Sequence, residues 1–307
     1  MMKHIPNARL SDYTTFQLGG PCSCLIECQS PDDLQKTIAT LSKNKTPFIL
    51  IGGGSNLVVS DSGVTTAVIR YLSEEPLIER VGNEVIVSAS TILDDLALFC
   101  VSEGLTGLNY TTGIPGTVGG AVVGNAGAWG KQVGDVLSSA VILDKSGNSK
   151  QVDRSYFAFQ YRHSHLKESD EIVASVSFTL TPADPLVLAK ERSEIVKLRA
   201  EKHPDLTRFP CAGSFFRNIE PTPKADRRQV TGGFLEDAGG KHLKVGGAQI
   251  FEKHANIIVK GPGCTAQDVF DLHLQMMKVV KDKFDLQLNR EVRFVGDFRD
   301  HKHEGFW

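Results

Sequence analysis

The chain has 307 residues, enough for two or three domains, and its 41% hydrophobic and 23% charged residues are typical of a globular protein. The formal net charge of −2 excludes an overall basic field that would hold nucleic acid or an anionic membrane. Neither a secretion signal nor an apolar run long enough to cross a membrane is present, so we expect a cytoplasmic protein. The six cysteines lack the paired spacing of a zinc site, and we expect reduced thiols and no metal.

In the first 180 residues, local patterns alternate between strand and helix. A helix is expected from Pro31, because Ser30 is a favourable N-cap and apolar residues follow at helical spacing. A second helix is expected over residues 93–102, ended by Gly104. The expected strands are residues 25–28, 48–51, 67–71, 77–81, 85–89, 136–143, 149–152 and 171–180, with hairpin turns at Gly82-Asn83 and Gly147-Asn148.

The second part of the chain begins with a charged helix over residues 186–202, which we interpret as an amphipathic connector. Further helices are expected over 233–238 and 266–284, and strands over 257–259 and 292–295. Strands and helices mixed in this order, with several hairpins, indicate an α+β chain rather than a doubly wound parallel sheet.

Two glycine clusters dominate the sequence, in which 29 of 307 residues are glycine. Glycine allows close approach of backbone to a ligand, and successive N–H groups in such loops form an anion-binding concavity. Neither cluster is a Walker loop or a dinucleotide fingerprint, and tight turns remain the alternative. The candidate pyrophosphate-binding residues are Gly52, Gly53, Gly54, Ser55 and Asn56 in the first cluster, and Gly113, Gly116, Thr117, Gly119, Gly120, Asn125, Gly127 and Ala128 in the second.

Three distant polar residues are candidates for chemistry. Arg162 can clamp a carboxylate through two hydrogen bonds, Ser214 follows a glycine and precedes two phenylalanines, and Glu291 lies at the start of the last expected strand. A desolvated glutamate can hold a proton near neutral pH. The alternatives are a surface ion pair for Arg162, a turn or cap for Ser214 and a solvated charge for Glu291. The glycine clusters and these polar residues alone predict a dinucleotide-binding enzyme of unknown chemistry.

Ordered along the chain, these motifs resemble the UDP-N-acetylenolpyruvoylglucosamine reductase family, in its shorter form without an inserted substrate loop. The resemblance is carried by residues 14–20, 52–57, 113–120, 125–128, 161–162, 212–216, 246–249 and 291–294. It implies an FAD-binding domain of the vanillyl-alcohol-oxidase type with lobes at residues 1–70 and 71–200, and a smaller α+β substrate-binding domain at 201–307. It also implies non-covalent FAD, since residues 54–56 contain no histidine or cysteine.

The resemblance implies a reaction in which NADPH reduces the flavin and the flavin then passes hydride to an enolpyruvyl ether. Arg162 and Glu291 are expected to stabilise the enolate-like state and Ser214 to donate the proton. Substrate contacts are expected from Lys202, Asn218, Lys241, Trp129 and Tyr161. Trp129 stands where the family usually has tyrosine, which keeps a stacking surface but loses the phenol oxygen.

Two other functions stay open at this point. One is a flavin-dependent oxidase of the same fold that acts on a sugar or alcohol, which has no need for Ser214 and Lys202 in register. The other is a catalytically silent nucleotide-binding protein, against which the intact Arg162, Ser214 and Glu291 argue.

Overall fold

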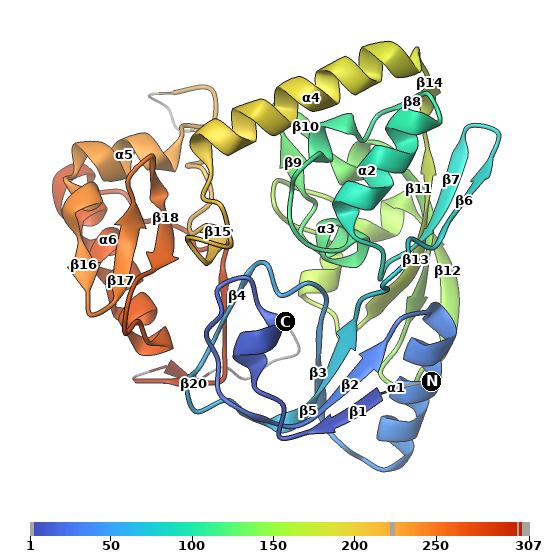
Figure 1. Ribbon diagram of the computed structural model, residues 1–307, viewed down its shortest axis with the longest axis horizontal. Coiled ribbons are helices and arrows are strands. Elements are labelled where there is room, and N and C mark those ends of the chain that lie inside the picture. Colours follow the sequence, from blue (N-terminus) through green and yellow to red (C-terminus); the bar gives the residue numbers. More distant parts are fainter. Residues whose placement is uncertain (1–2, 222–224, 300, 303–307) are drawn as a thin grey trace.

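The computed structural model describes residues 3–221, 225–299 and 301–302, which form three groups of elements (Figure 1). The N-terminal strands lie at the bottom of the view, the middle of the chain at the upper right, and the C-terminal elements at the left. In this described part of the chain, no helix is long and apolar enough to cross a membrane.

The first group is a four-stranded sheet in the order β1 (Lys3–Pro6), β2 (Cys22–Cys28), β5 (Val64–Tyr71), β3 (Phe48–Ile51). The pairs β2–β5 and β5–β3 are parallel, whereas β1–β2 is antiparallel. Helix α1 (Pro31–Lys43) begins as expected, with the Ser30 hydroxyl accepting the Asp33 N–H at 3.2 Å. Leu34 and Ile38 of α1 are fully buried, because the helix packs against both β2 and β13 (Ile172–Thr179) of the next sheet.

The second group is an antiparallel five-stranded sheet in the order β12 (Ser149–Asp153), β11 (Leu137–Leu143), β13 (Ile172–Thr179), β7 (Glu84–Ser88), β6 (Ile78–Val81). Both predicted hairpins are confirmed, and Gly82 in the first turn has φ +63°. Helix α2 has the predicted bounds Leu93–Ser102. The short helix α3 (Val118–Val123) inside the second glycine cluster was not predicted, because its two glycines and β-branched valines disfavour a helix.

The third group is an antiparallel sheet in the order β15 (Cys211–Ser214), β18 (His254–Lys260), β17 (Ala248–Phe251), β16 (Lys244–Val245). It packs with α5 (Thr231–Asp237) and with α6, whose predicted bounds Ala266–Phe284 are confirmed. Strands β15 and β17 were not predicted from the sequence.

Segments from the two ends of the chain join the first and third groups. Strand β4 (Leu57–Val59) pairs in parallel with β19 (Arg293–Val295). Phe16 is fully buried in the core of the C-terminal group, and the Thr15 hydroxyl donates to the Cys211 carbonyl at 2.7 Å. The segment that contains Thr15 and Phe16 therefore anchors the C-terminal group. The domain boundaries proposed at residues 70 and 200 stay predictions.

The remaining short elements are η1 (Leu10–Tyr13), β8 (Leu105–Thr106), η2 (Asn109–Thr111), β9 (Gly127–Ala128), β10 (Lys131–Gln132), η3 (Val133–Asp135), η4 (Arg154–Phe157), η5 (His165–Lys167), β14 (Thr181–Pro182), η6 (Gly240–His242), β20 (Asp297–Phe298) and β21 (His301–Lys302).

The long helix α4 (Pro185–Lys202) runs across the top of the molecule, from the second group to the third (Figure 1). The prediction that this helix is amphipathic was wrong, because Leu188 is its one buried residue and no apolar face is covered. Polar contacts attach it instead. Arg192 binds Asp94 of α2 through two hydrogen bonds of 2.8 Å, and the same carboxylate accepts the Gly113 N–H at 2.8 Å. One carboxylate thus fixes both α4 and the second glycine cluster.

Asp94→Asn is expected to lower the free energy of unfolding at pH 7 by about 1–2 kcal/mol, the scale of a partly exposed charged hydrogen bond. Burial raises the pKa of Asp94, but the hydrogen bonds from Arg192 and from the Gly113 N–H outweigh it, so the pKa is lowered overall. A carboxyl with a lowered pKa stabilises the fold above its unfolded pKa, and this contribution disappears as the pH falls through the folded value. Urea unfolding of both proteins should show a difference that shrinks below about pH 4; a difference that grows there would contradict the assignment.

Candidate active site

A cavity of about 520 Å³ lies where the three groups meet. Its wall is built from both glycine clusters, from the end of β15 and from the segment that leads into β19. The predicted site residues that line it are Gly52, Gly53, Gly54, Ser55, Asn56, Gly116, Thr117, Gly120, Gly127, Ala128, Trp129, Arg162, Ser214 and Glu291.

The two glycine clusters touch each other along this wall. A methyl group on Gly52 would lie 2.5 Å from the Thr117 hydroxyl oxygen, and one on Gly116, which has φ +121°, would lie 2.7 Å from the Ser55 hydroxyl oxygen. The Ser55 hydroxyl donates to the Pro115 carbonyl at 3.0 Å, which joins the clusters directly. Only glycine permits this approach, and the backbone that it leaves exposed fits the phosphates of a dinucleotide.

Part of the second cluster serves the fold. The Thr117 hydroxyl accepts the Gly120 N–H at 3.3 Å and so caps α3, and the Gly119 N–H donates to the Ala89 carbonyl at 2.9 Å. The amide of Asn125, which is 1% exposed, contacts three other residues: it donates to Gln132 and to the Gln160 carbonyl and accepts the Gly134 N–H. Gly113, Gly119 and Asn125, which were predicted to bind the cofactor, do not line the cavity, whereas Thr117 and Gly120 do.

Arg162 and Glu291 form an ion pair at the cavity, with Arg162 Nε 3.0 Å from Glu291 Oε1. Their side chains are 24% and 21% exposed, so water screens the pair only partly. The N–H of Arg162 Nε does not point at this oxygen and is without a hydrogen bond in the described structure. This nitrogen is buried, although Arg162 as a residue lines the cavity.

Backbone contacts hold Glu291 next to Ser214. The Glu291 N–H donates to the carbonyl of Phe215 at 2.9 Å, and the Glu291 carbonyl accepts the Asn56 side-chain amide at 3.1 Å. Asn56 was predicted to bind the cofactor, and the structure gives it this second task. Ser214 ends β15, follows Gly213 with φ +75°, and lines the cavity. The three predicted catalytic residues therefore share one site.

Four cationic or titratable residues of the cavity wall were missed: Lys167, Arg199, His203 and Arg293. Burial lowers the pKa of Arg293 to about 10, with a further contribution from Arg290. Burial and nearby arginines lower the pKa of Lys167 to about 8. Such an excess of cations favours an anionic ligand. Arg293 stands two residues after Glu291 and His203 directly follows Lys202, and this closeness to predicted residues was the available sequence signal. Lys167 and Arg199 had none.

The predicted substrate contacts divide into two sets. Trp129 is 57% exposed beside the cavity, with the Arg199 guanidinium 5.3 Å from its ring centroid. Lys202, Tyr161, Asn218 and Lys241 do not line the cavity.

Three of these four make contacts elsewhere, and Lys202 is an exposed residue at the end of α4. The Tyr161 hydroxyl accepts the Asn218 N–H at 3.3 Å. The Asn218 side-chain oxygen accepts the Thr231 N–H, also at 3.3 Å. Lys241 forms an ion pair with Glu236. Their role toward a ligand stays a prediction.

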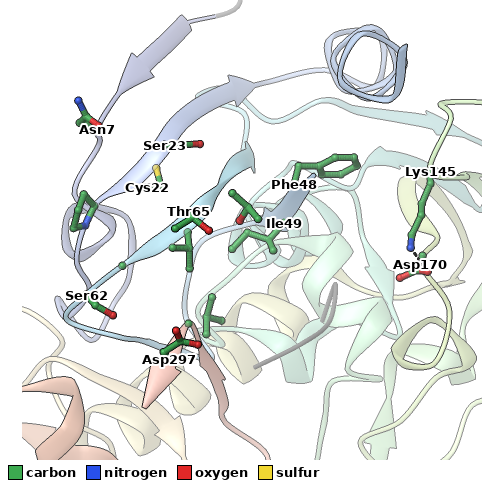
Figure 2. A pocket seen from close by; sticks show the side chains of 16 residues that line it. Asn7, Cys22, Ser23, Phe48, Ile49, Ser62, Thr65, Lys145, Asp170 and Asp297 are labelled. Carbon is green, nitrogen blue, oxygen red and sulfur yellow. Dashed lines mark ion pairs between the residues drawn. The ribbon is translucent and has the colours of Figure 1, made fainter. Parts of the chain in front are cut away.

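A second cavity of about 860 Å³ opens beside β2 and β5 and is lined by none of the predicted site residues (Figure 2). An ion pair between Lys145 and Asp170 stands at one side, away from Ser62 and Asn7. Ile49 and Val295 line both cavities.

Comparison with known proteins decides the family. Residues 204–295 match the family model described as UDP-N-acetylenolpyruvoylglucosamine reductase, C-terminal domain, and residues 22–153 match an FAD binding domain. The chain is 36% identical to the UDP-N-acetylenolpyruvoylglucosamine reductase of Lactobacillus acidophilus, over 94% of this chain and 93% of the relative. It belongs to the UDP-N-acetylenolpyruvoylglucosamine reductase family. The namesake from Listeria monocytogenes is 34% identical over 95% of this chain and 94% of its own length.

A solved structure of the reductase family supports the same assignment. The crystal structure of UDP-N-acetylenolpyruvylglucosamine reductase from Thermus caldophilus has a TM-score of 0.77 to this chain, with 29% identity. The alignment covers 96% of this chain and 99% of that chain. The prediction of an FAD-binding domain with a C-terminal domain of this reductase family is confirmed.

Gly52→Ala is expected to weaken FAD retention about tenfold or more, because its methyl group would lie 2.5 Å from the Thr117 hydroxyl oxygen. The measurement is the ratio of flavin to protein absorbance after gel filtration. Gly233→Ala is the matched control, since a methyl group there meets open space. Full flavin content in Gly52→Ala would show that the contact between the two clusters is not needed for the cofactor.

Proposed function

We propose that this protein reduces the enolpyruvyl ether of UDP-N-acetylenolpyruvoylglucosamine to UDP-N-acetylmuramate, with bound FAD and with NADPH as the hydride donor. One observation supports this most directly: the Arg162–Glu291 ion pair, with its 3.0 Å Nε–Oε1 distance, lines the same cavity as Ser214 and both glycine clusters. The family relatives carry the name of this reaction.

FAD, when bound between the glycine clusters, supplies the hydride chemistry that the side chains of this chain lack. Arg162 binds the carboxylate of the enolpyruvyl group and stabilises the negative charge that develops beside it. Glu291, fixed through Phe215 and Asn56, orients the guanidinium. The hydride ends on the terminal vinyl carbon, so the carbon beside the carboxylate still needs a proton.

Ser214 is the proposed donor of that proton. Its hydroxyl transfers the proton to the carbon next to the carboxylate, and the serine oxygen is reprotonated afterwards from solvent. A hydroxyl is a weak acid in water, which is why the step requires a dry site and a strongly basic carbon. The next two residues, Phe215 and Phe216, are 0% and 1% exposed, so the chain directly after the serine is buried.

The nucleotide end of the substrate is proposed to bind outside the cavity wall. Trp129 offers a stacking surface at the cavity, and Lys202 ends α4 beyond it. Tyr161 precedes Arg162 in the chain, and its hydroxyl accepts the Asn218 backbone N–H at 3.3 Å. With Lys241, these are the proposed contacts of the uridine diphosphate, a small-molecule partner that we expect the protein to meet in the cytoplasm.

Anaerobic flavin spectroscopy tests this function. Purified protein should be yellow, NADPH should bleach the colour, and the enolpyruvyl sugar nucleotide should restore it without oxygen. If oxygen restores the colour rapidly and the sugar nucleotide has no effect, the protein is an oxidase. If NADPH does not bleach bound flavin, or no flavin is bound, the silent nucleotide-binding alternative holds.

A further inference from the structure

Arg162 reaches the cavity from a strained turn. Gln160 and His163 close the turn through reciprocal backbone hydrogen bonds of 3.0 and 3.1 Å, so Tyr161 and Arg162 are its two central residues. Arg162 has φ +55°, a left-handed conformation that non-glycine residues rarely adopt. Such strain persists only where the surroundings impose it, and it is frequent at functional sites.

Lys167, the last residue of η5, binds the backbone of this turn. Its ammonium group donates to the Arg162 carbonyl at 2.8 Å, and its side chain lines the same cavity. The Lys167 N–H donates to the Ser164 carbonyl at 3.0 Å, and the Ser164 hydroxyl donates to the Val123 carbonyl of α3 at 2.8 Å. The lysine is thereby braced against α3 while it holds the residue that carries the catalytic guanidinium.

The charges around Lys167 come from several parts of the chain. Arg162, Arg217 and Arg293 act on it with like charge, and Glu291 is the opposing carboxylate. On the elements packed against η5, α3 carries no titratable group, while on η4 Arg154 donates to the Gly134 carbonyl and Tyr156 donates to Glu171. On η5 itself, His165 packs edge-on against the Tyr156 ring, and the adjacent Glu168 pairs with His163.

We propose that Lys167 is a positioning residue of the reductase: its ammonium group fixes the Arg162 carbonyl so that the guanidinium receives the carboxylate of the substrate. The proposal rests on the proposed function, and it adds a residue that acts through Arg162. The left-handed turn, the 2.8 Å hydrogen bond and the shared cavity wall are the observations that carry it.

The proposal has a pH signature. Burial, together with the charges of Arg217, Arg293 and Arg162, lowers the pKa of Lys167 to about 8, against the opposing effect of Glu291. Below this pKa the group is a charged donor, and above it a neutral amine whose hydrogen bond to a carbonyl is weaker. The hydrogen bond from Lys167 to the Arg162 carbonyl is therefore expected to weaken as the pH rises above about 8. The affinity of the protein for a carboxylate ligand should fall with it.

Calorimetry of the FAD-loaded protein with two nucleotides tests this without turnover. UDP-N-acetylmuramate carries the carboxylate, and UDP-N-acetylglucosamine lacks it. Lys167→Met should bind the first about tenfold more weakly, the scale of one charged hydrogen bond, and the second as wild type does. Lys167→Arg should keep the preference for the carboxylate and lose its decline near pH 8, because arginine does not titrate there. The control is Lys190→Met, an exposed residue of α4 outside the cavity.

Equal weakening of both nucleotides in Lys167→Met would show a merely structural role and overturn the proposal, as would unchanged affinity for UDP-N-acetylmuramate. Should Lys167→Met not fold, Lys167→Gln decides, since it keeps a neutral donor: binding of the carboxylate nucleotide as tight as in Lys167→Arg overturns the proposal, and selective weakening supports it. Wild-type protein that binds neither nucleotide would instead refute the proposed function.

Discussion

Ser214→Ala is expected to leave the bleaching of the flavin by NADPH unchanged and to slow its reoxidation by the enolpyruvyl sugar nucleotide about 10²-fold or more, the scale of a lost proton donor. Ser214 lines the cavity at the end of β15, and the adjacent Phe215 carbonyl accepts the Glu291 backbone N–H at 2.9 Å. Removal of one oxygen atom leaves this backbone arrangement in place. The substrate should therefore still bind, and the loss should appear in the rate of the second half-reaction.

Stopped-flow absorbance under anaerobic conditions separates the two half-reactions. A solvent isotope effect on reoxidation is expected in the wild type, because the hydroxyl exchanges with water before it donates. Ser102→Ala, an exposed hydroxyl on α2, serves as the matched control. Reoxidation of Ser214→Ala at the wild-type rate would remove Ser214 from the mechanism and leave the proton to another group or to water.

Features with a local cause could be predicted from the sequence. Helix α1 begins at Pro31 because Ser30 caps it, and α6 has its expected bounds because its apolar residues recur at helical spacing over 19 residues. The Gly82-Asn83 turn was clear for the same reason, since its residues alone determine the hairpin. The glycine clusters also predicted a close approach of the backbone to a ligand. They did not predict that the two clusters contact each other.

Features with a distant cause could not be predicted. The parallel pairing of β4 with β19 joins Leu57 to Arg293, and no pattern near either residue indicates the other. Lys167 is an ordinary lysine in the sequence. It lies five residues after Arg162, but its segment is held in place by the Ser164 hydroxyl, which donates to the Val123 carbonyl 41 residues away. The ion pair of Arg162 with Glu291 also joins residues that lie far apart in the sequence. Before the fold was known, only the resemblance to a family indicated that Arg162 and Glu291 act together.

Arg162→Ala is expected to slow reoxidation of the reduced flavin by about 10²- to 10³-fold, the scale of a lost electrostatic contact to developing charge. Arg162→Lys should recover part of this rate, because a lysine keeps the charge but not the two parallel hydrogen bonds of a guanidinium. The carbonyl that accepts the Lys167 ammonium group belongs to the backbone and is present in each variant, so Lys167 keeps its acceptor. Reduction of the flavin by NADPH provides the internal control, since the carboxylate of the substrate takes no part in it.

Glu291→Gln removes the partner of Arg162 without removing its volume, and it is expected to slow reoxidation by a similar factor. If the 3.0 Å ion pair acts as one unit, the double variant Arg162→Ala/Glu291→Gln should be hardly slower than the worse single variant. If the decrease in reoxidation rate of the double variant equals the product of the decreases of the two single variants, the residues act independently. Because Glu291 is fixed by the Phe215 carbonyl and the Asn56 amide rather than by Arg162, the glutamine should keep its place, and the loss would then report on charge rather than on a displaced backbone.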